Sequence, residues 1–168
     1  MPTANDDEIG VLQDHSVVVT FDKLLVNDTG SDGTTLTIVD VSATSTNGGT
    51  IAITGNEVSF TPTTGFNGLD LFTYTLSDGC NSVSGSVFVS VLSAATPSAN
   101  RIGDLRLDTD GAHVRFAAIP GFNYSVERST TNTIWTSVGS VIAGPDGMIE
   151  FLDQNPPSGA VYYRTTTP

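Results

Sequence analysis

The sequence predicts an all-β protein that contains two immunoglobulin-like or fibronectin-like β-sandwich domains joined by a short polar linker. Apolar and polar residues alternate over short segments, and Gly, Asn, Asp or Pro interrupts them about every ten residues. No segment repeats its apolar residues with the period of a helix. Alternation buries one face of each strand and leaves the other in water, which is what a two-layer sandwich requires.

The first half carries the clearest alternation. Val17, Val19 and Phe21 share one face of a predicted strand, and Asn47-Gly48-Gly49 can adopt the positive φ angles of a tight hairpin. We expect a first domain over residues 1–93, with strands at residues 17–21, 36–41, 50–54, 58–61, 69–76 and 84–92.

A polar segment without alternation separates the two halves and predicts a linker over residues 94–100, hinged near residues 96–98. The second domain is expected over residues 101–168. Its small core should depend on the aromatic residues Tyr124, Trp135 and Tyr163. Its predicted strands are residues 104–108, 112–118, 123–128, 134–138, 148–152 and 161–165.

Sequence motifs in the first half suggest a family. Ala-Asn-Asp-Asp at residues 4–7 precedes Asn-Asp at 27–28, Asp-Gly at 32–33 and the segment 66–79. Their order over residues 4–92 resembles the immunoglobulin-like and cadherin-like repeats of bacterial surface proteins. The resemblance implies modules that display and connect rather than catalyse.

The second half resembles a short fibronectin type III domain over about residues 101–168. The resemblance rests on the segment 120–129, on Trp135 and on Val-Tyr-Tyr-Arg at residues 161–164. Members of that family usually carry a tryptophan in an early strand, and Phe116 stands nearest to that position here.

The cadherin-like resemblance also implies a calcium site. Calcium takes six to eight oxygen ligands, so several loops must contribute carboxylates. This chain has Gly30 and Thr34 where acids are common in the family, and it has no acid in residues 93–100. We therefore expect no required cofactor and no calcium between the halves. A weak calcium site at the N-terminal edge is the alternative to plain turn capping. Its candidate ligands are Asp6, Asp7, Asp28 and Asp32.

The net charge of −12 opposes binding to nucleic acid or to anionic membranes, since both need basic surfaces. No apolar stretch approaches the roughly 20 residues that span a bilayer. We expect protein partners instead. The single lysine, Lys23, is expected to be an ordinary surface residue rather than the partner in an isopeptide bond.

Catalysis is not expected. The only histidines, His15 and His113, lie in different halves, and no histidine is near the single cysteine, Cys80, in sequence. No nucleophile elbow or phosphate-binding loop is present.

Two functional classes remain. The first is a structural protein on a virion surface, decorating a head or tail with one domain anchored and one projecting. The absence of a secretory signal after Met1 favours it. Its partners would be capsid, tail or surface-layer proteins, or a second copy of the chain. The alternative is an adhesion or matrix module of a large secreted bacterial protein, located outside the cell or on its surface. A carbohydrate-binding module would need a row of exposed aromatic residues, and glycan binding stays open.

Overall fold

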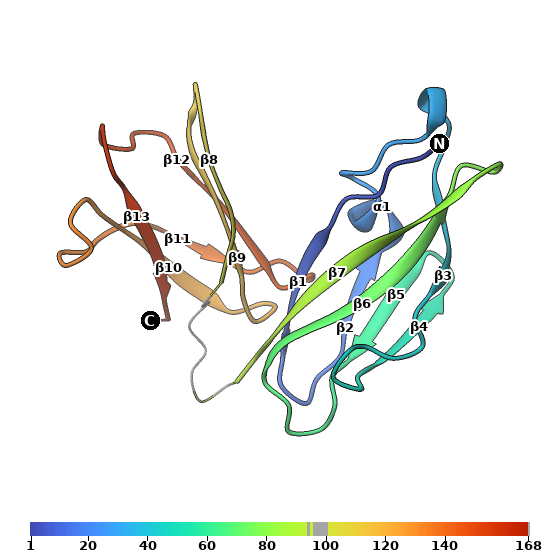
Figure 1. Cartoon of the computed structure of the whole chain (residues 1–168). Helices are drawn as coiled ribbons and strands as arrows, with labels where there is room; N and C mark the ends of the chain where they lie inside the picture. Colours follow the sequence, from blue (N-terminus) through green and yellow to red (C-terminus); the bar gives the residue numbers. More distant parts are fainter. Residues whose placement is uncertain (94, 96–100, 168) are drawn as a thin grey trace.

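The computed structural model describes residues 1–93, 95 and 101–167, with side chains for all of these except Asp32 and residues 101–104. Strands contain 54% of the residues and helices 4%, which confirms the all-β prediction. In the described part, the strands form four sheets, and no sheet combines strands from both halves (Figure 1).

Two sheets build the sandwich of the first half. Strands β1, β7, β6 and β3 form one sheet in that order, and β2, β5 and β4 form the other. β1 pairs with β7 in parallel, whereas the other neighbours are antiparallel. The strands are β1 Asp7–Leu12, β2 Val17–Thr20, β3 Thr37–Val41, β4 Thr50–Thr54, β5 Glu57–Thr61, β6 Gly68–Ser77 and β7 Ser82–Leu92.

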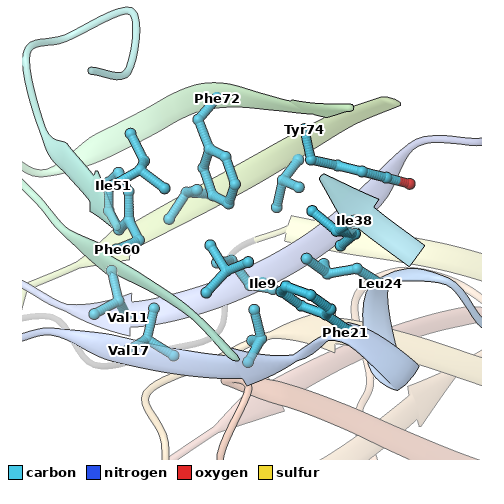
Figure 2. Packing of buried hydrophobic residues seen from close by; sticks show 14 of the residues in the cluster. Ile9, Val11, Val17, Phe21, Leu24, Ile38, Ile51, Phe60, Phe72 and Tyr74 are labelled. Carbon is cyan, nitrogen blue, oxygen red and sulfur yellow. The ribbon is translucent and has the colours of Figure 1, made fainter. Parts of the chain in front are cut away.

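The core of this sandwich lies between the two sheets, where alternate residues of each strand point inward (Figure 2). Phe60 of β5 and Phe72 of β6 stack across the layers, with ring centroids 5.9 Å apart. Tyr74 and Leu76 continue the same face of β6 and are fully buried. The period-2 pattern of the sequence is therefore the pattern of burial.

The structure differs from the predicted strands at the N-terminal edge. β1 was not predicted, because Asp7 and Gly10 weaken the apolar pattern of a segment that also carries the acidic motif. The strand predicted over residues 17–21 ends at Thr20. Phe21 starts the one-turn helix α1, Phe21–Leu24, whose first turn is capped by the Thr20 hydroxyl accepting from the Lys23 N–H at 3.3 Å.

The second half forms a smaller pair of sheets, with strand orders β12-β9-β8 and β11-β10-β13. The predicted strands are present with shifted ends; the one predicted at residues 134–138 begins later and runs further. The strands are β8 Arg101–Asp108, β9 Gly111–Ala117, β10 Asn123–Ser129, β11 Thr136–Ile142, β12 Met148–Asp153 and β13 Tyr162–Thr166. The predicted hinge at residues 96–98 lies outside the described residues.

Two of the three aromatic residues predicted for the second core are buried there. Tyr124 and Tyr163 are 0% and 5% exposed, and both belong to the core cluster. Trp135 does not belong to it. It is half-buried beneath the guanidinium of Arg164, which lies 4.3 Å from the ring centroid. The prediction was wrong for Trp135 because sequence alone could not show that Arg164 of β13 covers the ring.

The two halves contact each other directly. β1 lies against β9 and β12 of the second half (Figure 1). The backbone N–H of Gly10 in β1 donates to the carbonyl of Asp146, just before β12, at 2.9 Å. The acidic N-terminal edge of the first sandwich is therefore next to the second sandwich.

Candidate functional site

The predicted acidic site begins with two chain segments that lie side by side. Thr3 and Thr29 exchange backbone hydrogen bonds of 2.8 and 3.1 Å, which joins the N-terminal segment to the loop after α1. The side-chain amide of Asn27 donates to the carbonyl of Asp6 at 3.0 Å, and that of Asn5 donates to the carbonyl of Asn27. Backbone and side-chain amide hydrogen bonds therefore hold the motif at residues 4–7 beside the motif at residues 27–28.

Asp28 fastens this network to the core. One carboxylate oxygen accepts from the Asn5 N–H at 2.7 Å, and the other accepts from the Tyr74 hydroxyl at 2.7 Å. Tyr74 is buried in β6, so the bond ties a surface loop to the interior. Burial and the bond to Asp28 raise the pKa of the Tyr74 hydroxyl well above its usual value. Both Asp28 oxygens therefore accept structural hydrogen bonds, as the side chain of an aspartate that caps a turn does.

Asp7 has the most perturbed carboxylate of the cluster. Burial raises its pKa to about 7; the negative charges of Asp28 and Asp6 act in the same direction, while the Tyr74 hydroxyl and the Arg115 guanidinium oppose it. Its Oδ2 atom is buried and has no hydrogen-bond partner in the described part of the chain. A buried polar atom without a partner is costly, and a cation is one way to satisfy it.

The structure brings three of the four predicted metal ligands to one edge. Asp6 and Asp7 line the same pocket, and Asp28 acts on Asp7 electrostatically. Asp32 lies in the 3-10 turn η1, Ser31–Gly33, and its side chain is outside the described residues. Three carboxylates, one of them already bonded through both oxygens, supply few of the six to eight oxygens that calcium prefers. The donor set therefore suits weak binding, and the calcium site remains a prediction.

Sequence reasoning missed a second cluster, in the β8–β9 hairpin. Asp108, Asp110 and His113 place their ligand atoms within 4.8 Å of one another, the only such trio among the described residues. The His113 ring nitrogen lies 2.9 Å from Asp110, and that hydrogen bond lowers the pKa of the Asp110 carboxyl. The Asp110-Gly111 turn signal was visible in the sequence and could have indicated that the hairpin brings Asp108 and His113 close together.

This hairpin cluster already has a positive charge beside it. The guanidinium of Arg106 lies 2.7 Å from Asp108, and Asp108 and Asp110 are exposed. Arg106 opposes His113 in the register of the β8–β9 hairpin, and Asp108 lies next to both of them. We interpret the cluster as surface ion pairing on a turn, which contributes little to stability.

Lys23 and Cys80 complete the predicted functional residues. Lys23 reaches the second half, where its Nζ lies 3.0 Å from Asp146 and 3.6 Å from Glu150. It is therefore an interdomain ion-pair residue, a role that sequence spacing could not indicate. Cys80 is an exposed free thiol in the turn between β6 and β7.

Comparison with known proteins identifies the first half. The model of the cadherin-like domain family matches residues 1–92, more than half of the chain, and the chain therefore belongs to that family. No curated protein matches the sequence. The fibronectin type III resemblance of the second half remains a prediction.

Two solved structures share a distant likeness. The D00-D0 domain of intimin is 13% identical, with a TM-score of 0.36, over 99% of this chain and 92% of that one. An endo-fucoidan hydrolase of glycoside hydrolase family 107 is 18% identical, with a TM-score of 0.37, over 55% of this chain and 14% of the hydrolase. This chain thus spans a small part of the hydrolase, and at these TM-scores neither likeness carries an argument about function.

Proposed function

We propose that this cadherin-like chain is a non-enzymatic structural module that displays or connects proteins at a surface outside the cell. Domains of this family are typically non-catalytic and surface-exposed. In the described part of the chain, no helix is long and apolar enough to cross a membrane.

The observation that carries the proposal is the use of the most buried carboxylates. Asp70 accepts from the hydroxyls of Ser45 and Thr46 at 2.6 and 2.8 Å and from the Asn47 N–H at 3.0 Å. Burial acts to raise the pKa of Asp70, but these bonds outweigh it and the pKa is lowered. An acid held ionised by loop donors fixes a loop; it is a poor proton donor for catalysis.

The second half uses its buried carboxylate in the same manner. Asp153 accepts from the Tyr163 hydroxyl and from Arg128, both at 2.7 Å. Burial again opposes ionisation, and again the hydrogen bonds prevail and lower the pKa of Asp153. Both halves thus use buried acids to hold strands and loops in place, which suits a structural or display role.

For the identity of the surface, we propose a virion, where one sandwich anchors to a capsid or tail protein and the other projects. The two-body architecture supports this arrangement, since each sandwich has its own core and offers its own outer surface. With only six basic residues, the contact should be apolar and polar rather than basic. Exposed apolar side chains such as Leu69 and Leu107 are available for it.

The alternative is an adhesion or matrix module of a secreted bacterial protein, which family membership supports. Mass spectrometry of purified particles and of culture supernatant separates the two. Many copies per particle would support the virion proposal. Detection only within a longer secreted polypeptide would reject it in favour of the adhesin. Binding of purified protein to a glycan array, with hydrolysis of the bound glycan, would overturn the non-enzymatic proposal itself.

A further inference from the structure

The joint between the two halves is built on a contact between two glycines. Gly10 of β1 faces Gly147, in the turn before β12, and both are buried. A Cβ atom on Gly10 would overlap the carbonyl oxygens of Ala118 and Gly147, and a Cβ on Gly147 would overlap the Gly10 backbone. The Gly10 N–H also donates to the Asp146 carbonyl at 2.9 Å. Backbone meets backbone here, a fit that any side chain would prevent.

Opposite charges surround this contact. Lys23 of the first half lies 3.0 Å from Asp146, whose side chain is only 13% exposed, and 3.6 Å from Glu150. Arg115 of β9 approaches Glu150 from the second half at 3.5 Å. Glu150 is thus shared by one cation from each half.

In a pocket of about 320 Å³ beside the joint, acidic residues of the first half also meet a basic residue of the second half. Asp6 and Asp7 of the first half line it together with Arg115 of the second. The Oδ2 atom of Asp7 and the Nε atom of Arg115 are both buried without a hydrogen-bond partner among the described atoms. A guanidinium keeps its charge at all ordinary pH values, so Arg115 brings a permanent positive charge to the acidic edge.

From these contacts we infer that the two sandwiches form one stiff unit in which Lys23 and Arg115 supply the positive charge at the joint, so that it holds without a metal ion. The glycine contact sets the geometry, and the two cations balance the acids that the halves bring together. Asp146 is largely buried, so its pair with the partly exposed Lys23 is less screened by salt than a fully exposed pair.

A ligand site for anions is the competing explanation for these cations. Lys23, Arg106 and Arg115, three of the six basic residues of the chain, line one groove of about 790 Å³ between the halves. Each of them faces a carboxylate, from Asp146, Asp108 and Glu150 respectively. The groove therefore offers an acidic ligand no net positive charge. Of these three pairs, Lys23–Asp146 crosses the joint, and the other two hold their cations within the second half.

Distance measurements between spin labels test the inference on the whole chain. One label is placed on the natural Cys80, at the β6–β7 turn, and the second on the Ser158→Cys variant, in the exposed connection between β12 and β13. We expect a single narrow distance distribution that is the same with chelator and with added calcium. A broad distribution, or one that becomes narrow only with calcium, would overturn the inference.

The Gly10→Ala variant tests the geometry of the joint. The three atoms nearest to its new Cβ all belong to the second half, so both sandwiches should keep their folds while the distribution broadens. Hydrogen exchange monitors each sandwich separately. A distribution as narrow as that of the unsubstituted chain would reject the glycine contact.

The double variant Lys23→Gln, Arg115→Gln tests the charges without altering the glycine contact. We expect it to broaden the distribution in the absence of calcium. The matched control is Arg164→Gln, which removes an ion pair with Glu127 inside the second half, 2.6 Å apart and remote from the joint. An unchanged distribution in the double variant, or equal broadening in the control, would show that the two cations do not hold the joint. This result is independent of Gly10→Ala, so it decides the inference even if that variant fails to fold.

Discussion

The two sandwiches stabilise their interiors differently. Among the described residues, the first core cluster has sixteen buried apolar residues, and the second has nine, three of them alanine. The first is built mainly from aliphatic side chains around the Phe60–Phe72 stack, with one tyrosine, Tyr74, whose hydroxyl donates to Asp28. The second depends on two buried tyrosines whose hydroxyls are engaged: Tyr124 accepts from the Ile119 N–H at 3.0 Å, and Tyr163 donates to Asp153.

This difference shows how a small β domain compensates for a small core. A domain below about 70–80 residues rarely gains more than a few kcal/mol from apolar burial alone. A buried tyrosine adds a large apolar ring and, through its hydroxyl, a bond that fixes where the ring lies. The second half should therefore be the less stable of the two and the more sensitive to the loss of polar contacts.

The largest expected effect comes from removing one core phenylalanine in each half. Phe72→Ala and Phe116→Ala should each cost about 3–5 kcal/mol of the free energy of unfolding, since both rings are almost completely buried. This cost should leave the first half folded and the second half largely unfolded at room temperature. Hydrogen exchange resolved by peptide measures this. An equal loss of protection against hydrogen exchange in both halves would contradict the expected difference in their stability.

The next effect concerns the charge at Asp153. Asp153→Asn should destabilise the second half by about 1.5–3 kcal/mol, because hydrogen bonds that involve a charged partner are the stronger ones. Glu127→Gln is the control: it removes the partly exposed ion pair with Arg164 and should cost less than about 1 kcal/mol. Calorimetry measures both. If Glu127→Gln lowered the free energy of unfolding as much as Asp153→Asn, the buried bonds of Asp153 would contribute no more stability than a partly exposed ion pair.

Acid should act on the second half through the same residue. The pKa of Asp153 is lower in the folded chain than its ordinary value of 3.8. Its contribution to stability is therefore present above that value and is lost as the pH falls through the folded pKa. We expect the melting temperature of the second half to fall between about pH 5 and pH 2, and Asp153→Asn to flatten that dependence. An identical acid profile in the variant would assign the effect to other carboxylates.

Calcium should have the smallest effect, and only on the first half, which holds Asp6, Asp7 and Asp28. A dissociation constant of about 10⁻⁴ to 10⁻³ M, typical of extracellular modules, gives at most about 1.4 kcal/mol at roughly 1 mM calcium. Melting curves with calcium and with chelator measure the shift. Asp7→Asn should abolish it, and Asp40→Asn, an exposed acid in β3, should leave it intact.

A melting temperature that falls by tens of degrees on chelation would show a much stronger site and would also contradict a metal-free joint. No shift in either direction would leave turn capping as the whole role of the acidic motif. Neither outcome involves the second core, so the expected behaviour of that core does not change.

The sequence by itself determined the strands of both sandwiches, except for β1. Side chains alternate between the two faces of a strand, so a buried face imposes a period of two that is readable without any knowledge of partners. In the strand predicted at residues 84–92, Val87, Val89 and Val91 are spaced two apart, and all three are buried. The turn residues Asp110-Gly111 place the β8–β9 hairpin for the same local reason. The hairpin predicted at Asn47–Gly49 is only a tight turn, because the flanking strands β3 and β4 belong to different sheets.

Only the tertiary structure decided which segments meet. β1 exists because β7 offers it a parallel edge, and its glycine, which weakens it as a strand, is what lets the second half approach. Trp135 lies outside the core, beneath the guanidinium of Arg164. Lys23 pairs with Asp146 and Glu150, which are more than a hundred residues away in the sequence. Such contacts join residues distant in the chain, so no local pattern records them. They depend on how the strands pack within each sandwich and on how the two sandwiches meet.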